Sequence, residues 1–356
     1  MSWEENVRKV VPYVAGEQPK KSGVIKLNTN ECPYPPAPGV TKLAAEMDCD
    51  SLRLYPDTNA TTLTAALADY YHVNQNQIFV GVGSDDVLSM AFMTFFDSGK
   101  PILFPDVTYS FYDVWADLYR IPYKTCALTE DWHIRPEDYA QPNGGVIFPN
   151  PNAPTGLLED PETVERIIAA NRDVVVIVDE AYIDFGGVSA LPLIEKYDNL
   201  LIVQTFSKSR AMAGMRIGFC MGNEKLIQYL NDVKFSFNSY TMNYPAQVLG
   251  VEAVRDEAYF KATTAKIVAT RERVKGQLAE LGFTFPDSQA NFIFASHESV
   301  PAEQIFRALR EAEIYVRHWN KPRISNCLRI TVGTDEEMDK LLSFLKKYLS
   351  EAVKKA

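Results

Sequence analysis

Residues 174–182 have the sequence VVVIVDEAY, five β-branched side chains followed directly by two acids. β-Branched residues favour a strand, and because no polar residue alternates with them, both faces of the surrounding sheet should be covered. An acid placed directly after such a strand, here Asp179, needs a partner because an unpaired buried charge is costly. The stretch therefore predicts a buried strand that carries a carboxylate to the edge of a sheet.

Further short apolar runs have the same character, and helical stretches separate them. Residues 84–96 and 160–171 are expected to be helices, the first because Ser84 caps it and acids fill its first turn. Strands alternating with helices indicate an α/β fold with a mainly parallel sheet sandwiched by helices. The other strands are expected at 78–80, 101–104, 145–148 and 200–203.

The pattern divides the chain into three parts. Residues 1–30 are expected to form an N-terminal arm, because the proline-rich stretch 33–38 cannot continue a helix. Residues 31–251 are expected to form the large domain. From residue 252 a long charged helix runs to 281, and residues 252–356 are expected to form a smaller C-terminal α+β domain. Its other elements are strands at 291–294 and 328–332 and helices at 301–312 and 336–354.

Composition excludes several kinds of partner. The 356-residue chain has a formal net charge of −10, and no Lys/Arg block offers a surface for nucleic acid. No stretch of about 18 uncharged apolar residues occurs and no secretory leader opens the sequence, so a cytoplasmic, non-membrane protein is expected. The four histidines and five cysteines lack metal-ligand or disulfide spacing, so no metal is expected.

The residues that follow each strand carry the chemistry, because open α/β sheets bind ligands beyond the carboxyl ends of their strands. The strand at 200–203 is followed by Thr205, Ser207 and Lys208, and then by Arg216. Two hydroxyls and a guanidinium suit a phosphate. A lysine held near other cations can have its pKa lowered enough to attack an aldehyde. This stretch predicts a phosphate clamp beside a nucleophilic amine.

Two other strand ends point the same way. The rigid turn 149–156 can present amides to a ligand, and Gly81-Val82-Gly83 leads into a helix start whose free N–H groups suit a phosphate. Each feature alone has an ordinary explanation. Asp179 could be a helix cap, Lys208 a solvated charge and Arg216 half of a surface ion pair. The order and spacing of the whole set are more specific.

In that order, the motifs resemble those of the fold type I aminotransferases that use pyridoxal 5′-phosphate (PLP). The motifs are NPNAPTG (150–156), VDEAY (178–182) and TFSKSxAMAGMRxG (205–218), and the resemblance spans nearly the whole chain. Within that group the chain is similar to the histidinol-phosphate aminotransferases, which implies amino transfer between L-histidinol phosphate and 2-oxoglutarate. The subgroup marks are KLNTNECP (26–33), LYPD (54–57), ANF (290–292) and NCLRITVG (326–333).

The resemblance implies how the cofactor is held. Lys208 binds PLP covalently, Asp179 pairs with the pyridine nitrogen, and Tyr182 hydrogen-bonds the ring hydroxyl oxygen. Tyr109 stacks on the ring, although core packing is a serious alternative for an aromatic residue there. The cofactor phosphate is assigned to Thr205, Ser207, Arg216 and the backbone N–H groups of Ser84 and Asp85, with Tyr55 reaching it from the neighbouring subunit of a homodimer.

The resemblance also implies the substrate contacts. Arg329 matches the arginine that binds the α-carboxylate of glutamate, for which its planar two-point geometry is suited. Tyr13 and Arg317 match positions near the substrate phosphate. Because histidinol phosphate has no carboxylate and 2-oxoglutarate has two, one cationic pocket has to accept either anion in turn.

Two stretches depart from the family pattern. Ala153 stands where the family often has an asparagine that contacts the cofactor, so either Asn152 substitutes or Tyr182 acts alone. Residues 318–323, HWNKPR, do not follow the usual pattern after Arg317, which leaves the contact to the substrate phosphate open. His318 is expected at the surface rather than against the substrate.

Other functions remain compatible with the sequence. An aromatic aminotransferase and a threonine-phosphate decarboxylase share the fold. A dinucleotide-dependent oxidoreductase would use Gly81-Val82-Gly83 for phosphate and Asp106 for ribose, but Asp86 stands in the place of the third glycine. A non-catalytic PLP-binding regulator would share the fold as well, but no appended DNA-binding segment remains once the landmarks are placed.

Overall fold

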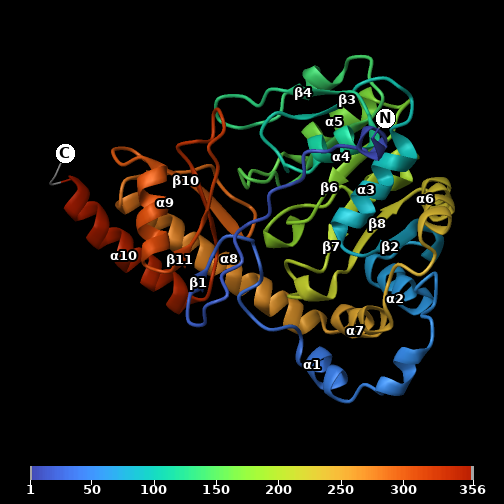
Figure 1. Ribbon diagram of the computed structural model, residues 1–356, viewed down its shortest axis with the longest axis horizontal. Helices are drawn as coiled ribbons and strands as arrows, with labels where there is room; N and C mark the ends of the chain where they lie inside the picture. Colours follow the sequence, from blue (N-terminus) through green and yellow to red (C-terminus); the bar gives the residue numbers. More distant parts are fainter. Residues whose placement is uncertain (1, 354–356) are drawn as a thin grey trace.

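A seven-stranded sheet forms the centre of the larger lobe in this computed structural model, which describes residues 2–353 (Figure 1). Its strand order is β2-β8-β7-β6-β5-β3-β4, and only β8 runs against the others, so the predicted mainly parallel α/β sheet is confirmed. The strands are β2 (Ile78–Gly81), β3 (Ile102–Pro105), β4 (Tyr123–Cys126), β5 (Val146–Pro149), β6 (Val176–Asp179), β7 (Leu200–Thr205) and β8 (Gly218–Gly222).

Helices cover both faces of this sheet, which explains the uninterrupted apolar strands. In β6, Val176 and Val178 pack in the hydrophobic cluster on one face, and Ile177 packs in the cluster on the other. The first face is covered by α1 (Pro38–Ala45), α2 (Thr61–Tyr71), α5 (Pro161–Ala170) and α7 (Tyr244–Arg255), and the second by α3 (Ser84–Phe95), α4 (Tyr112–Tyr119) and α6 (Glu224–Phe237).

The smaller lobe is built on an antiparallel sheet in the order β12-β13-β10-β9. Its helices enclose a separate hydrophobic cluster, and none of the helices within residues 2–353 is long and apolar enough to cross a membrane. The predicted last residue of the final helix, Lys354, lies outside the described residues. The elements are β9 (Phe283–Thr284), β10 (Phe292–His297), α9 (Ala302–Glu311), β12 (Arg317–His318), β13 (Leu328–Thr331) and α10 (Asp335–Val353).

One long helix, α8 (Glu257–Glu280), connects the two lobes (Figure 1). The sequence pattern placed its start at residue 252, but residues up to Arg255 still belong to α7. Asp256 separates the two helices because its carboxylate accepts a hydrogen bond from the backbone N–H of Tyr259 and so caps α8. The domain boundaries at residues 30 and 251 remain predictions.

The N-terminal segment joins the smaller lobe before the chain enters the larger one. β1 (Ile25–Lys26) pairs in parallel with β11 (Ile314–Tyr315). The residues that follow β1 then pass between the lobes on their way to α1. The predicted arm is therefore anchored at its C-terminal end, and this end forms part of the wall between the lobes.

The start of β8 lies directly against the start of α3. A Cβ atom added to Gly218 would lie 2.2 Å from the backbone of both Gly83 and Ser84. Real Cβ atoms do not approach backbone so closely, so only glycine allows this contact. The last glycine of the motif at 205–218 thus sets the position of a helix terminus that faces the cleft.

We expect Gly218→Ala to displace the start of α3 and to lower the melting temperature by roughly 2–8 °C, the usual size of overpacking in a protein of this length. Gly276→Ala is the matched control, because a Cβ added there in α8 meets no atom within 4 Å. Differential scanning calorimetry of both variants tests this. Equal melting temperatures for the two would contradict the close contact.

Candidate active site

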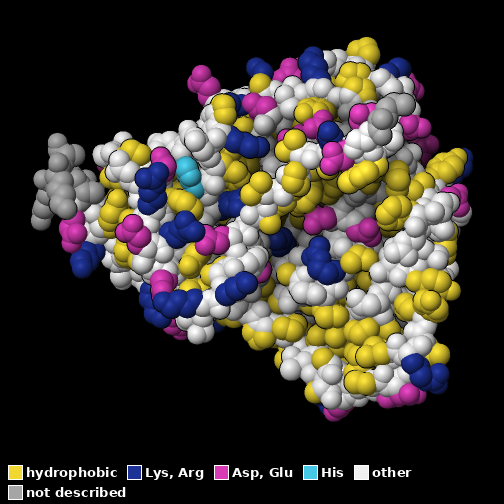
Figure 2. Space-filling view, viewed as in Figure 1, with side chains coloured by type: hydrophobic (Ala, Val, Ile, Leu, Met, Phe, Trp, Pro, Cys, Tyr) yellow, Lys and Arg dark blue, Asp and Glu magenta, His cyan; other side chains and the backbone are white. Residues whose placement is uncertain are grey.

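A cavity of about 650 Å³ lies between the lobes, at the carboxyl ends of the parallel strands. Both lobes and the N-terminal segment contribute to its wall, and Figure 2 shows acidic and basic side chains in the hollow there. The position agrees with the rule that α/β sheets bind ligands at this edge. Of the predicted site residues, the wall includes Tyr13, Asp85, Tyr109, Tyr182, Lys208, Arg216, Arg317 and Arg329.

Lys208 lies in the turn after β7 and points toward the N-terminal segment. Its Nζ donates a hydrogen bond to the carbonyl oxygen of Thr29 (3.1 Å) and lies 5.8 Å from the centre of the Tyr182 ring. The lysine is half-buried at the cavity wall. The amine is therefore held within a polar pocket rather than in bulk solvent, as a nucleophile requires.

Asp179 ends strand β6 and is almost completely buried. Its Oδ2 accepts a hydrogen bond from the hydroxyl of Tyr112 (2.9 Å), and its Oδ1 accepts one from the backbone N–H of Ala181 (3.2 Å). Burial raises the pKa of Asp179 to about 6. Both donors are neutral, so the carboxylate is oriented but still lacks a cation to balance its charge.

Tyr112 was not among the predicted site residues. It begins α4, is fully buried, and burial together with Asp179 raises the pKa of its hydroxyl. It therefore stays a hydrogen-bond donor at neutral pH. The sequence signal for Tyr112 was its position: it comes three residues after Tyr109, which lies in the loop between β3 and α4.

Tyr182 is held by a residue that the sequence also did not single out. Asn30 Nδ2 donates to the Tyr182 hydroxyl (3.0 Å), while the Asn30 backbone N–H donates to the Thr331 hydroxyl (3.0 Å). The Asn30 carbonyl in turn accepts from Asn291 Nδ2 (3.0 Å). Through Asn30, the N-terminal segment thus connects the large lobe, at the Tyr182 hydroxyl, with the small lobe.

The structure does not bring Asn152 to the cavity wall. Its Nδ2 donates to the Val107 carbonyl (3.0 Å) and the Thr155 hydroxyl (3.1 Å), and its Oδ1 accepts from Thr108 (3.2 Å). The amide is used entirely to shape the turn at 149–156. Asn30, not Asn152, presents an amide beside Tyr182.

A phosphate-sized cradle lies at the N-terminus of α3. No side chain caps this helix, so its first backbone N–H groups are free to bind a ligand. Gly83 has φ +89°, and a Cβ there would lie 2.3 Å from the guanidinium of Arg216, which stands over the helix terminus. The helix dipole and the guanidinium both favour an anion at this point.

The side chains around the cradle are connected. Thr205 donates to the Ser207 hydroxyl (3.0 Å), which also accepts from Arg216 Nη1 (3.4 Å). The carboxylate of Asp85 lies 3.6 Å from Arg216 and accepts from the Tyr109 hydroxyl (2.8 Å). The predicted phosphate residues therefore come together, and Tyr109 is fixed at the edge of the cradle.

Two arginines stand on the wall contributed by the small lobe. Arg317 donates to the carbonyl oxygens of Val14 (2.9 Å) and Ala15 (3.2 Å), and Arg329 donates to that of Asn28 (2.9 Å). Nε of Arg329 is buried without a hydrogen-bond partner. None of these partners is an acid, so both positive charges remain available to an anionic ligand.

Tyr13 and Tyr55 occupy different positions relative to the cavity. The Tyr13 ring stacks on Phe111 at 4.0 Å and lines the cavity. Tyr55 is 82% exposed, contacts the ring of Tyr240 at 4.5 Å, and is not part of the cavity wall of its own chain.

The geometry disfavours a dinucleotide site. The carboxylate of Asp106 is already bound by Arg323 (2.6 Å) and by the backbone N–H of Leu128 (3.0 Å). Asp86 accepts from the N–H of Val82 (2.9 Å) inside the glycine turn. Asp106 is therefore not free to bind a ribose, and the Asp86 carboxylate occupies the turn at 81–83. His318 lies outside the cavity wall, with Nε2 2.8 Å from the Ser325 carbonyl oxygen.

Comparison with known proteins defines the class. The model of the family described as "Aminotransferase class I and II" matches residues 22–345. The chain therefore belongs to the class I and II aminotransferases, which are PLP-dependent enzymes. The expected fold, enzyme class and cofactor are confirmed.

Within that family the similarity is more specific. The chain is 51% identical over 354 residues to the histidinol-phosphate aminotransferase of Lactococcus lactis subsp. cremoris (strain MG1363), with 99% of each chain covered. It is 47% identical to that of Clostridium botulinum (strain Langeland / NCTC 10281 / Type F), covering 98% of this chain and 99% of the relative. The solved histidinol-phosphate aminotransferase of Sinorhizobium meliloti, in complex with pyridoxal-5'-phosphate, has the same fold. Its TM-score is 0.84 at 24% identity, over 92% of this chain and 91% of that one.

The residues present fit PLP. The cradle at α3 is a site that an added Cβ would fill, and Arg216 above it suits the cofactor phosphate. The buried Asp179 carboxylate lacks a cation, which a protonated pyridine nitrogen would supply. Lys208 lies in the same cavity, with an amine that can condense with the aldehyde.

We expect Tyr112→Phe to weaken PLP binding about tenfold near neutral pH, the usual effect of losing one hydrogen bond to a charged group. The Tyr112 hydroxyl favours the ionised carboxylate, so its loss should raise the pKa of Asp179 above about 6. Because a protonated Asp179 cannot pair with a pyridinium, PLP affinity falls as the pH is lowered through this pKa. In the variant the fall should begin at a higher pH.

Titration of the cofactor-free protein with PLP, followed by absorbance between about pH 5 and 8, measures this midpoint. Tyr119→Phe is the matched control, because Tyr119 lies at the other end of α4 and its hydroxyl is 2.7 Å from the Ser89 hydroxyl rather than near Asp179. The titration of PLP itself is common to all three proteins and cancels in the comparison. An unchanged midpoint in Tyr112→Phe would contradict the proposed support of Asp179.

Proposed function

We propose that this enzyme transfers the amino group between L-histidinol phosphate and 2-oxoglutarate, a reaction of histidine biosynthesis. The observation that carries the proposal is the pair Arg317 and Arg329, which line the same cavity as Lys208 and have neutral carbonyl partners only. Such a wall suits a substrate with a phosphate and a co-substrate with two carboxylates. The full-length identity to named histidinol-phosphate aminotransferases supports the same substrate pair.

Lys208 is proposed as the catalytic residue. When bound, PLP supplies an aldehyde that condenses with amines and a protonated ring that withdraws electrons. Lys208 would hold the cofactor through its amine, and Nζ, once an amino donor takes its place, would act as the base that takes the proton from Cα of the donor and passes it on. The reverse sequence with 2-oxoglutarate completes a ping-pong cycle.

We propose the remaining cofactor contacts, and the positions of the side chains support them. Asp179 pairs with the pyridine nitrogen, and Tyr182 with Asn30 holds the ring hydroxyl oxygen, a role that the sequence had offered to Asn152. Tyr109 packs against the ring, and Asp85 orients it. The phosphate is bound by Thr205, Ser207, Arg216 and the N–H groups of Ser84 and Asp85.

The anion site is proposed to accept two chemically different groups, the carboxylate of one substrate and the phosphate of the other. Arg329, with its open Nε, takes the α-carboxylate of glutamate. Arg317 and Tyr13 take the phosphate of histidinol phosphate, which enters beside the N-terminal segment. The guanidinium fork serves carboxylate and phosphate equally well, so one pocket can serve both half-reactions.

We expect purified enzyme to convert histidinol phosphate with 2-oxoglutarate at least ten times more efficiently than phenylalanine, because only the phosphate ester uses Arg317. Coupled measurement of glutamate formation gives kcat/KM for each donor. Lys208→Ala is the control, and we expect near-total loss of turnover with either donor.

Preference for phenylalanine would replace this proposal by an aromatic aminotransferase, and release of carbon dioxide from threonine phosphate would replace it by a decarboxylase. Substantial turnover by Lys208→Ala would contradict the assignment of the catalytic amine.

A cytoplasmic homodimer with shared active sites is proposed as the assembly. Tyr55 is too exposed to serve its own chain, and it lies among other exposed apolar side chains, which favours contact with a second copy. In that arrangement Tyr55 reaches the cofactor phosphate of the neighbouring subunit. These exposed side chains are Leu52 and Leu54, which precede Tyr55 in the chain, and Tyr240, whose ring it contacts.

Mixed dimers test the shared site. If Lys208 and Tyr55 of one site come from different chains, a dimer of Lys208→Ala with Tyr55→Ala retains one intact site. Random mixing after mild dissociation should then recover about a quarter of wild-type activity, because half of the dimers are mixed and each has one working site. A mixture of Lys208→Ala with Arg216→Ala is the control, since both residues serve the same chain's site in that arrangement. Equal recovery in the two mixtures would rule out sharing through Tyr55.

A further inference from the structure

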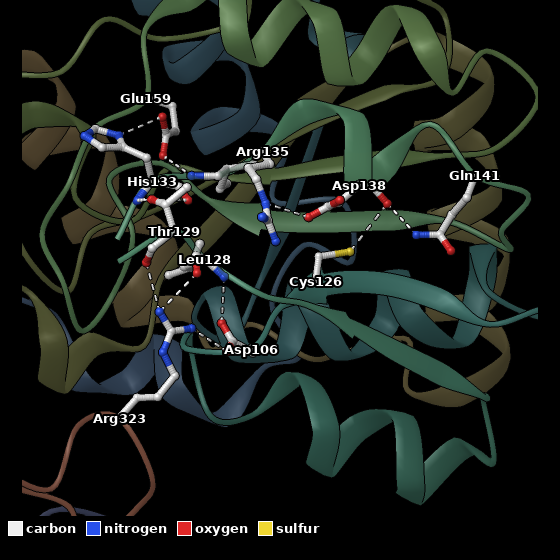
Figure 3. A network of polar contacts seen from close by, with 11 residues as sticks. Asp106, Cys126, Leu128, Thr129, His133, Arg135, Asp138, Gln141, Glu159 and Arg323 are labelled. Carbon is white, nitrogen blue, oxygen red and sulfur yellow. Dashed lines mark hydrogen bonds and ion pairs between the residues drawn. The ribbon is translucent and has the colours of Figure 1, made fainter. Parts of the chain in front are cut away.

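Arg323 makes an unusually complete set of contacts with the opposite lobe (Figure 3). Its Nη1 donates to Asp106 Oδ2 (2.6 Å), and its Nη2 donates to the carbonyl oxygens of Leu128 (3.0 Å) and Thr129 (2.9 Å). Its guanidinium also lies 4.9 Å from the centre of the Trp132 ring. Arg323 belongs to the loop 319–327, which connects β12 and β13 of the small lobe.

The part of the large lobe that contacts Arg323 is held in place by hydrogen bonds that do not involve Arg323. The Leu128 backbone N–H donates to Asp106 Oδ1 (3.0 Å), so the carboxylate is already oriented. The backbone N–H of Thr129 donates to the His133 carbonyl (2.9 Å), and the His133 backbone N–H donates to the Thr129 hydroxyl (2.8 Å). Both links close the turn at 129–133. Glu159 fixes the base of that turn by accepting from the Ile134 N–H (2.8 Å). The carbonyls that meet Arg323 are thus preformed.

The backbone on both sides is in a rare conformation. Arg323 has φ +67° and Trp132 has φ +74°, in the left-handed region that side chains other than glycine rarely adopt. Such residues persist where their surroundings over-determine them, and they gather at functional sites. The two strained residues stack on each other, which indicates that this contact is specified by both partners.

The contact lies at the rim of the substrate cavity rather than on a remote surface. Asp106 directly follows β3, and Trp319, Lys321 and Arg323 of the loop line the cavity. Ile324 is buried in the hydrophobic cluster of the large sheet, so the loop docks on the lobe opposite to the one that carries it. Its far end is held on its own lobe by Asn326, whose side chain accepts from the Ala302 N–H (2.9 Å).

Trp319 connects this loop to the anion-binding arginines. Its ring lies 5.3 Å from the guanidinium carbon of Arg317 and 5.2 Å from that of Arg329. A change in the position of the loop is therefore transmitted to both arginines. Arg323 is a weaker anion ligand than Arg317 or Arg329, because Asp106 neutralises its charge and three of its five N–H groups are used.

The exposure of Asp106 and Arg323 indicates how much their ion pair can contribute to the stability of the protein. The side chains of Asp106 and Arg323 keep 25% and 33% of their surface exposed, so solvent weakens their attraction and little global stability is expected from it. The geometric effect is different. A planar guanidinium that bonds one carboxylate and two carbonyl oxygens of the other lobe fixes a distance and an orientation.

We propose that Arg323 is a positioning residue that holds the loop 319–327 against Asp106, and so keeps Trp319, Arg317 and Arg329 in the arrangement that binds the phosphate end of the amino donor. The inference rests on the proposed function for the identity of that donor. Losing the contact lowers the fraction of enzyme in the binding-competent arrangement, which raises the apparent Kd in proportion. The proton transfer at Lys208 is unaffected once the donor is bound.

Rapid mixing of the PLP-loaded enzyme with histidinol phosphate, followed at the cofactor absorbance band, gives the apparent Kd and the limiting rate of the first half-reaction. For Arg323→Gln we expect a Kd about tenfold higher and a limiting rate within about twofold of wild type. Arg323→Lys should lie between the two, since a lysine pairs with Asp106 but cannot also bind both carbonyls.

Two further variants isolate the contact. Asp106→Asn keeps an acceptor for the Leu128 N–H but removes the charge. The apparent Kd of the double variant Asp106→Asn with Arg323→Gln should not exceed the higher of the two single-variant values, because both changes break the same contact. Arg135→Gln is the matched control, because Arg135 pairs with Asp138 (3.1 Å) in the same region but does not line the cavity. We expect it to behave as wild type.

Hydrogen exchange of the PLP-loaded enzyme supplies a readout that a general loss of stability would not produce. In Arg323→Gln, amides of residues 319–327 should exchange several-fold faster, while those of the central strands are unchanged. An unchanged Kd for Arg323→Gln overturns the proposal. A raised Kd also overturns it if cofactor affinity and melting temperature both fall in the same variant, because the effect is then a general loss of stability.

The two proposals fail separately. If wild-type enzyme does not react with histidinol phosphate, the proposed function fails, and the glutamate half-reaction then decides the role of Arg323. If wild type reacts and Arg323→Gln binds the donor equally well, only the role of Arg323 fails.

Discussion

The buried carboxylate of Asp179 is the constraint on which the site depends. It stands at the end of a central strand, where two neutral donors orient it, and in the described part of the chain it forms no ion pair. Because the side chain is almost completely buried, its charge is costly until a cation pairs with it. A heterocycle with a protonated ring nitrogen meets this need. Lys208, Tyr182 and the α3 cradle are arranged around the space that such a ring would fill.

The sequence predicted the central strands well because their apolar runs report burial on both faces. It missed β4 and β8 for opposite reasons. β4, YKTC, is an edge strand with three exposed residues, so its pattern resembles a loop. β8, GFCMG, is completely buried, but glycines at both ends weaken the strand signal, and one of them is required by contact with α3. Local pattern cannot reveal a constraint imposed by another element.

The same limit explains which site residues were found. Asp179 ends β6, and Lys208 and Arg216 lie in the segment that connects β7 to β8, so their position could be argued from the chain itself. Asn30 acts on Tyr182 across 152 residues, and Arg323 meets Asp106 across 217. Asn30 lies in the motif at 26–33, but neither that motif nor the sequence around Arg323 indicates the distant partner. Asn152 illustrates the converse, since a residue adjacent to the expected position has its amide fully used within its own turn.

The path of the N-terminal segment has a consequence for how the protein is made. Ile25 pairs with Ile314, and the Asn30 N–H bonds Thr331 across 301 residues. Ile25 and Asn30 are translated long before Ile314 and Thr331, their partners in these two contacts. The wall that faces the Lys208 amine is therefore completed only after the C-terminal strands have been synthesised, and a nascent chain that stalls before them contains the lysine without its surroundings.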